Sequence, residues 1–153
     1  MTETEDMVVL SDVHKAFNGH VILNGINLNI KKGETVVILG GSGSGKSVTL
    51  KHIVRLLLPD KGKIIIDGQE ISGKMKPLEI SEYRKKIGYL FQSAALINWL
   101  NVYDNIALPL RENTNLSEQE IKIRIDEKLK LLELEKAVHK LPSEISGGMK
   151  KRV

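Results

Sequence analysis

The stretch that decides the fold is Gly40-Gly41-Ser42-Gly43-Ser44-Gly45-Lys46-Ser47, which matches the phosphate-binding pattern G-x-x-x-x-G-K-[ST]. Its glycines allow backbone N–H groups to approach a polyphosphate closely. Lys46 is expected to reach the β- and γ-phosphates, and the Ser47 hydroxyl to reach Mg²⁺. We therefore predict that these eight residues bind a nucleoside triphosphate.

The segments on either side of this loop fit that prediction. Thr35–Leu39 is apolar and rich in β-branched residues, which predicts a strand, and Val48–Leu58 predicts a helix that ends before Pro59. A strand, a glycine loop and a helix N-terminus together place an anion where N–H groups and the helix dipole favour negative charge. The alternative is a flexible Gly/Ser linker that ends in Gly-Lys-Ser, and these flanks argue against it.

Composition limits the class of protein. The chain has 153 residues, 41% of them hydrophobic, which is enough for one domain with its own core. The net charge of +4 comes from 23 basic and 19 acidic residues that are interleaved, so nothing favours nucleic acid as a partner. Without cysteine, disulfides and Cys-ligated zinc are excluded. No apolar run approaches about 18 residues and the N-terminus is acidic, so we expect a soluble cytosolic protein that meets membranes through a partner.

Periodicity divides the chain into a mixed α/β part and a helical part. The first part, about residues 1–93, is predicted to hold strands at 8–17, 26–30, 63–67, 69–71 and 87–91 and a short helix at 81–86, with turns at 18–19 and 68. The helical part, about 94–145, begins with a short amphipathic piece at 103–108 that Pro109 is expected to stop. Ser117 and Glu120 form a capping box, and Ile121, Ile125, Leu129 and Leu132 line one face of the following helix. Residues 146–153 begin a further helix.

Three further candidate sites are weaker when each is taken alone. Gln92 follows a predicted strand, and its amide oxygen can hold a Mg²⁺-bound water, although a polar strand end facing solvent is the simpler explanation of a lone glutamine. Ser146 can cap a helix beside Gly147 and Gly148 and so form a second anion site, or only a capped turn. Phe17 can stack on an adenine or pack in the core.

The order of these motifs resembles the ATP-binding subunit of ATP-binding cassette (ABC) transporters. By that resemblance Phe17 is the adenine-stacking aromatic, and Gly40–Ser47 is the Walker A loop, with Val48 also at the nucleotide. Lys46 and Gln92, the Q-loop glutamine, serve catalysis, and Ser47 and Gln92 serve Mg²⁺. The signature motif, which meets the ATP of a partner subunit, is Ser146, Gly147, Gly148 and Met149. The implied fold is an α/β P-loop NTPase with an N-terminal antiparallel β part, an incomplete RecA-like core and an α-helical subdomain.

Within the family, residues 98–112 and the two glycine motifs are most similar to the ATPases of Mla/Mce-type lipid transporters. This implies ATP and Mg²⁺ as cofactors and a second copy of the cassette as partner. It also implies a transmembrane permease that contacts the helical part and, indirectly, an Mce-type substrate-binding protein. The expected location is the cytoplasmic side of the inner membrane. The expected function is to couple ATP binding and hydrolysis to phospholipid transport across a bacterial envelope.

The chain departs from the family pattern in three places. Met149 replaces a common glutamine, which fits the lipid subgroup, and Val48 replaces a Thr or Ser that can touch the α-phosphate. The Walker B strand with its aspartate and glutamate base, the D-loop and the switch histidine all follow the signature in the family, and none of them is present. Asp67 comes closest to such an aspartate, but it reads as a hairpin turn before Gly68. We therefore expect negligible hydrolysis by these 153 residues and an exposed, aggregation-prone Walker A strand.

Four other functions stay open. They are a cassette for a different cargo, such as an amino acid or a metal, a cassette protein that acts on DNA or ribosomes, a different P-loop enzyme such as a small kinase, and a nucleotide-binding remnant without turnover. The sequence between Gln92 and Ser146 bears on the first, because that region meets the permease. The spacing from the phosphate loop to Ser-Gly-Gly argues against the kinase.

Overall fold

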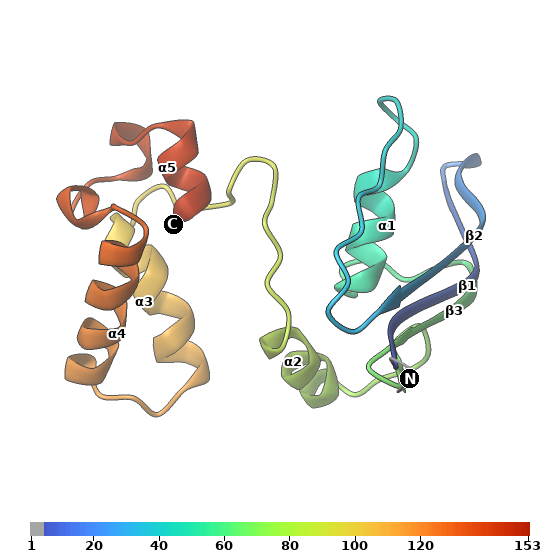
Figure 1. The fold of residues 1–153 in the computed structure, drawn as a ribbon, viewed down its shortest axis with the longest axis horizontal. Helices are drawn as coiled ribbons and strands as arrows, with labels where there is room; N and C mark the ends of the chain where they lie inside the picture. Colours follow the sequence, from blue (N-terminus) through green and yellow to red (C-terminus); the bar gives the residue numbers. More distant parts are fainter. Residues whose placement is uncertain (1–4) are drawn as a thin grey trace. The chain divides into compact units, whose positions relative to one another are not determined.

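The computed structural model describes residues 5–153, which form two compact units, residues 5–89 and residues 90–153 (Figure 1). The first unit holds the sheet and the phosphate loop, and the second is helical. This content agrees with the predicted fold class, an α/β fold with an N-terminal antiparallel β part and a separate α-helical part. The finer predicted boundaries at residues 93 and 145 stay a prediction.

A four-stranded antiparallel sheet forms the first unit, in the order β2-β1-β3-β4. The strands are β1 (Asp6–Phe17), β2 (His20–Lys31), β3 (Lys61–Ile66) and β4 (Gln69–Glu70). Both hairpin turns were predicted: Asn18 and Gly19 have φ of 50° and 81°, and Asp67 and Gly68 have 48° and 73°. Two successive residues with positive φ give a turn whose twist matches that of the strands it joins. The predicted strands at 8–17, 26–30 and 63–67 are confirmed, although β2 begins six residues earlier than expected.

The core of the first unit is apolar and lies on one side of this sheet, against α1 (Lys46–Ile53) and α2 (Pro77–Lys85). Its buried residues are Leu10, Val13, Leu23, Ile64, Ile66, Ile71 and Tyr83. The Tyr83 hydroxyl donates to the carbonyl of Ile53, and the Arg84 guanidinium donates to the carbonyl of Arg55 at 2.8 Å. Residues of α2 therefore satisfy carbonyl groups at the end of α1 that no helical N–H can reach.

Helix α1 is shorter than predicted, and α2 is longer. The prediction that α1 runs to Leu58 is wrong, because Arg55 adopts a left-handed φ of 54° and the helix ends at Ile53. The Arg55 side chain bonds the carbonyls of Ile71 and Gly73 at 2.8 and 2.9 Å, which holds this turn in place. Helix α2 begins at Pro77 rather than at residue 81, because a proline suits the first helical position.

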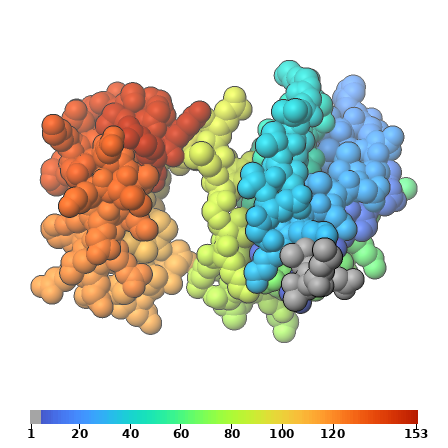
Figure 2. Space-filling view, viewed as in Figure 1, coloured from blue at the N-terminus to red at the C-terminus, as the bar shows by residue number. Residues whose placement is uncertain are grey.

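Two predicted strands do not form in the described part of the chain. Residues 35–39 and 87–91 have no strand assignment, and Val37, Leu39 and Leu90 are 74%, 87% and 64% exposed. A segment becomes a strand only when a neighbouring strand shares its hydrogen-bond ladder, and the sheet of residues 5–153 ends at β2 and β4. Figure 2 shows residues 35–45, drawn in blue to cyan, at the surface of this unit.

The second unit consists of α3 (Val102–Asn113), α4 (Glu118–Leu131), two 3₁₀ turns, η1 (Glu135–Ala137) and η2 (Pro142–Glu144), and α5 (Gly147–Arg152). Its buried core is Val102, Ala107, Ile121, Ile125, Leu129, Leu134, Ala137 and Ile145. The predicted apolar stripe on α4 is thus confirmed at its first three positions, and Leu132 packs partly buried against the same core.

Capping residues fix where the helices of this unit begin. The Asn101 side chain accepts the N–H of Asp104 at 2.8 Å. At α4 the predicted capping box is confirmed: Ser117 Oγ accepts the N–H of Glu120 at 3.3 Å, and the Glu120 carboxylate accepts the N–H of Ser117 at 2.8 Å. The Ser117 hydroxyl also donates to the Glu120 carboxylate, at 2.7 Å. This bond and the one from the Ser117 N–H lower the pKa of Glu120, because they favour the charged carboxylate.

The prediction that Pro109 stops the first helix of this unit is wrong. Helix α3 continues through Pro109 to Asn113, and the N–H of Thr114 still reaches the carbonyl of Leu110 at 3.1 Å. A proline removes one hydrogen bond from a helix interior, but Ala107 and Leu110 pack against the core on either side of it. Tertiary packing therefore overrides the local signal.

Replacing Ser117 with alanine should weaken the start of α4 by about 1 kcal/mol, because the N–H of Glu120 loses its acceptor. Hydrogen exchange of the α4 amides should then become about fivefold faster. Ser81→Ala, at an exposed position inside α2, is the matched control and should leave the exchange of α4 unchanged. Equal exchange rates in the Ser117 variant and the parent chain would show that the box does not stabilise the helix.

Candidate functional site

The phosphate-loop motif joins the extended segment 35–39 to the first turn of α1. Gly45 is the N-cap of α1 with φ of 89°, and Gly43 has φ of 80°. A Cβ at Gly45 would lie 2.7 Å from a methyl of Leu23 and 3.1 Å from the carbonyl oxygen of Ile22. A Cβ at Gly40 would lie 2.6 Å from Ser44 Oγ. Glycine is thus required at Gly45 by backbone conformation and by space, and this lets α1 begin directly against β2.

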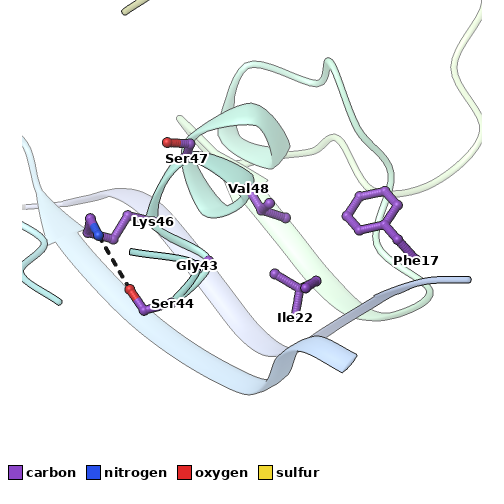
Figure 3. A pocket seen from close by; sticks show the side chains of 8 residues that line it. Phe17, Ile22, Gly43, Ser44, Lys46, Ser47 and Val48 are labelled. Carbon is purple, nitrogen blue, oxygen red and sulfur yellow. Dashed lines mark hydrogen bonds between the residues drawn. The ribbon is translucent and has the colours of Figure 1, made fainter. Parts of the chain in front are cut away.

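Lys46 closes the loop on itself. Its ammonium donates to the carbonyls of Gly40 and Gly41 at 2.8 and 2.7 Å, and lies 3.5 Å from Ser44 Oγ, the contact drawn as a dashed line in Figure 3. One positive charge therefore sits among the loop atoms, beside the N-terminal end of α1. A lysine held by neutral carbonyls can exchange them for phosphate oxygens, which bind an ammonium more strongly.

A pocket of about 240 Å³ runs alongside the loop. It is lined by Phe17, Ile22, Gly43, Ser44, Gly45, Lys46, Ser47 and Val48. Phe17 lies at one end of the view in Figure 3 and Lys46 at the other, with the apolar side chains of Val48 and Ile22 between them. The structure therefore brings the predicted base-stacking aromatic together with the predicted phosphate site. Phe17 is 40% exposed and is not among the buried core residues.

Two buried residues of α1 hold its first turn in place through hydrogen bonds to backbone carbonyls. Thr49 is buried, and both its N–H and its hydroxyl donate to the carbonyl of Gly45, at 2.8 and 3.1 Å. His52, also fully buried, bonds the carbonyl of Val48 at 2.7 Å through Nδ1. These residues hold the base of the loop, while Ser47 is exposed and lines the pocket.

The other predicted site residues belong to the second unit. Gln92 is exposed in a turn, next to Ala94 and Ala95, which have positive φ. Ser146 is the N-cap of α5, and its hydroxyl accepts the N–H of Met149 at 3.2 Å. The predicted cap is confirmed, whereas the roles of Gln92 and of Ser146–Met149 at a nucleotide stay predictions.

Sequence reasoning did not single out Ile22 as a pocket residue. The hairpin pairs Phe17 with His20 and Ala16 with Val21, so Ile22 comes to the same end of the sheet as Phe17. The Asn18-Gly19 turn fixes that register and was the available signal.

Comparison with known proteins gives the family. A sequence profile described as ABC transporter matches residues 23–153. The chain belongs to the ABC transporter family. It is 46% identical over 138 residues to a protein of Mycobacterium leprae named as a probable ribonucleotide transport ATP-binding protein, covering 90% of this chain and 40% of that protein. It is 43% identical over 132 residues to the intermembrane phospholipid transport system ATP-binding protein MlaF of Haemophilus influenzae, covering 86% of this chain and 50% of MlaF.

Solved structures show the same fold. An ATP-binding cassette described as a dimeric post-hydrolysis state bound to ADP and Pi superposes with a TM-score of 0.85 at 38% identity, covering 95% of this chain and 66% of that one. The chain spans about 40–50% of the length of the curated relatives described here. Among residues 5–153, no helix has the length and apolar character needed to cross a membrane.

Replacing Gly45 with alanine should destabilise the first unit by about 2–4 kcal/mol, because the backbone is left-handed there and the new methyl meets Leu23. Gly41→Ala is the matched control, since a Cβ there meets nothing within 4 Å. Its stability should stay within about 0.5 kcal/mol of the parent chain. Thermal unfolding followed by circular dichroism measures both, and equal losses in the two variants would contradict the packing argument.

Proposed function

We propose that this chain is the nucleotide-binding part of an ABC transporter ATPase subunit, and that its pocket binds ATP with Mg²⁺. The observation that carries the proposal is that Phe17 and Lys46 line the same pocket. A triphosphate placed on the loop would meet backbone N–H groups, the Lys46 ammonium and the N-terminal end of α1. Its base would then extend toward Phe17 across Val48 and Ile22.

Each part of the pocket has a separate role in this proposal. Lys46 and the loop amides neutralise phosphate charge, and the exposed Ser47 hydroxyl is placed to ligate Mg²⁺. Mg²⁺, when bound, spreads the negative charge of the β- and γ-phosphates. Phe17 supplies a stacking surface that is worth about 1–3 kcal/mol for a base. The Val48 side chain is apolar, so it cannot supply the hydrogen bond to the α-phosphate that a Thr or Ser at this position could make.

Residues of the second unit would complete the site in an assembled transporter. We propose that Gln92 contributes an amide oxygen to the Mg²⁺ shell, and that Ser146–Met149 meets the ATP held by a second copy of the cassette. The capped start of α5 supports the second role, because Ser146 accepts the N–H of Met149 and so fixes where the N-terminus of this helix begins. The solved cassette noted above is described as dimeric, which supports a homodimer.

Hydrolysis is expected to be negligible in these 153 residues alone. Asp67 is the carboxylate that most nearly follows an apolar strand, and it lies in the turn between β3 and β4 with φ of 48°. Its N–H donates to the carbonyl of Met7 at 2.9 Å, so it lies at the opposite end of β1 from Phe17. A well-placed general base contributes about 10²–10⁴-fold to a rate, so its loss would leave binding without turnover.

Phospholipid is the cargo we propose for the complete transporter. The support is the resemblance of residues 98–112 to lipid-transport ATPases and the similarity to MlaF. The proposed partners are a transmembrane permease that meets the helical unit and, indirectly, an Mce-type protein, at the cytoplasmic side of the inner membrane. A second candidate is import of a small solute, since the methionine import ATP-binding protein MetN of Legionella pneumophila is 41% identical over 96% of this chain. Mass spectrometry of small molecules extracted with the purified permease complex separates the two: bound phospholipid supports the first and bound methionine the second.

Replacing Lys46 with alanine should weaken binding of ATP with Mg²⁺ by about 10–100-fold, because a charged hydrogen bond to phosphate is lost. Isothermal titration calorimetry measures the affinity. Lys32→Ala, exposed in the turn after β2, removes the same charge away from the pocket and should leave the affinity unchanged. Unaltered binding by the Lys46 variant would show that ATP does not occupy this loop.

A further inference from the structure

The end of β1 that carries Phe17 extends beyond its neighbour β3. Pairing between the two strands stops at His14 and Lys61, so residues 15–17 have no opposite residue in β3. Asp60, just before β3, takes that place. Its N–H donates to the carbonyl of His14 at 2.9 Å, and its carboxylate accepts the N–H of Ala16 at 2.7 Å. A side chain thereby continues the ladder by one more residue toward Phe17.

The second oxygen of the Asp60 carboxylate binds Lys15, and Lys15 in turn contacts the aromatic ring of Phe17. The Lys15 ammonium donates to Asp60 at 2.7 Å and lies 5.4 Å from the centroid of the Phe17 ring, within the range of a cation–π contact. The Lys15 side chain is only 16% exposed, so it is held in this position rather than free in solvent. The bonds from Lys15 and Ala16 lower the pKa of Asp60, which keeps the carboxylate ionised.

A close approach between the start of β3 and β1 holds Asp60 against β1. Gly62 has φ of 90°, and a Cβ there would lie 2.2 Å from the carbonyl oxygen of Asp12. Asp12 itself has φ of 49°, at an irregularity where the pairing of β1 with β3 shifts register. This close approach requires glycine at position 62. Asp60 lies in the segment that follows α1, the helix that begins at the phosphate loop. Its bonds to β1 therefore link this segment to the strand that carries Phe17.

We propose that Asp60 is a positioning residue for the base-binding end of the nucleotide pocket, acting through Lys15 and Ala16 on the ring of Phe17. Lys15 occupies one face of that ring, which leaves the other face for an aromatic base. The proposal rests on the nucleotide binding proposed above and adds a residue that does not line the pocket. Asp60 affects the base of a nucleoside triphosphate and leaves the grip on its phosphates unchanged.

Two ligands separate these effects: ATP, which uses both ends of the pocket, and inorganic tripolyphosphate, which uses only the phosphate loop. Calorimetric affinities for both, with Mg²⁺, are compared in the parent chain and in Asp60→Ala. Stacking on an aromatic corresponds to about 5–150-fold in affinity. Disturbing the ring without removing it should therefore weaken ATP binding by about three- to tenfold. Tripolyphosphate affinity should stay within about twofold, which also shows that the variant is folded around its loop.

Two further variants sharpen the test. Asp60→Asn keeps an oxygen for the Ala16 N–H but loses the charge that holds Lys15, so its ATP affinity should fall between those of the parent chain and Asp60→Ala. Glu82→Ala breaks an exposed ion pair with Lys85 inside α2 and is the matched control. It should bind both ligands like the parent chain.

A double-mutant cycle with Phe17→Leu decides whether Asp60 acts through the ring. In the Phe17→Leu background, Asp60→Ala should produce no further loss of ATP affinity. An undiminished loss in that background, an equal loss for ATP and tripolyphosphate, or no loss at all would each overturn the positioning role. If the parent chain binds ATP no more tightly than tripolyphosphate, only the positioning role is overturned. If it binds neither ligand, the proposed nucleotide site fails as well.

Discussion

The close contact between Gly45 and β2 is the constraint on which the nucleotide pocket depends. Because Gly45 has no Cβ, the first turn of α1 begins against the carbonyl of Ile22 and the side chain of Leu23. Leu23 is buried in the sheet core, while Ile22 lines the pocket. One residue of β2 thus anchors the loop to the core, and its neighbour forms the pocket wall. The hairpin to β1 then places Phe17 at the other end of the same pocket.

The two ends of the pocket are also joined through the segment that follows α1. Helix α1 carries Lys46 and ends in a turn held by Arg55, Tyr83 and Arg84, and the chain then returns to β1 at Asp60. The distance between phosphate loop and aromatic ring is therefore set by rigid elements and hydrogen bonds, not by the pocket side chains alone. Such preorganisation reduces the ordering cost of binding.

Local signals in the sequence predicted local structure well. The Asn18-Gly19 turn and the capping box at Ser117 act over four residues or fewer, and both were predicted in place. What depended on distant residues was missed. The segment 35–39 needs a neighbouring strand, Pro109 is tolerated because α3 packs on the helical core, and α1 ends early because Arg55 reaches Ile71 and Gly73. These contacts join residues that are far apart in the sequence, so a local spacing pattern cannot predict them.

In the candidate site, too, the sequence predicts the local part, and the parts that depend on distant residues appear only in the structure. The phosphate loop was recognisable because one short pattern contains its glycines, Lys46 and Ser47. The presence of Phe17 in the same pocket depended on a hairpin register that only the structure shows. No local pattern identifies the role of Asp60, because that role comes from the place where β3 begins relative to β1. A Pro-Asp-x-Gly turn between a helix and a strand is the signal that could have drawn attention to it.

The central claim is that Phe17 and the phosphate loop are two ends of one ATP site. Nuclear Overhauser contacts between the chain and bound ATP with Mg²⁺ test it most directly. Contacts from the adenine protons to the Phe17 ring and the Val48 methyls, together with shifted amides at Gly43–Ser47, are the predicted result. Shifted loop amides with adenine contacts elsewhere, or with none, would contradict it.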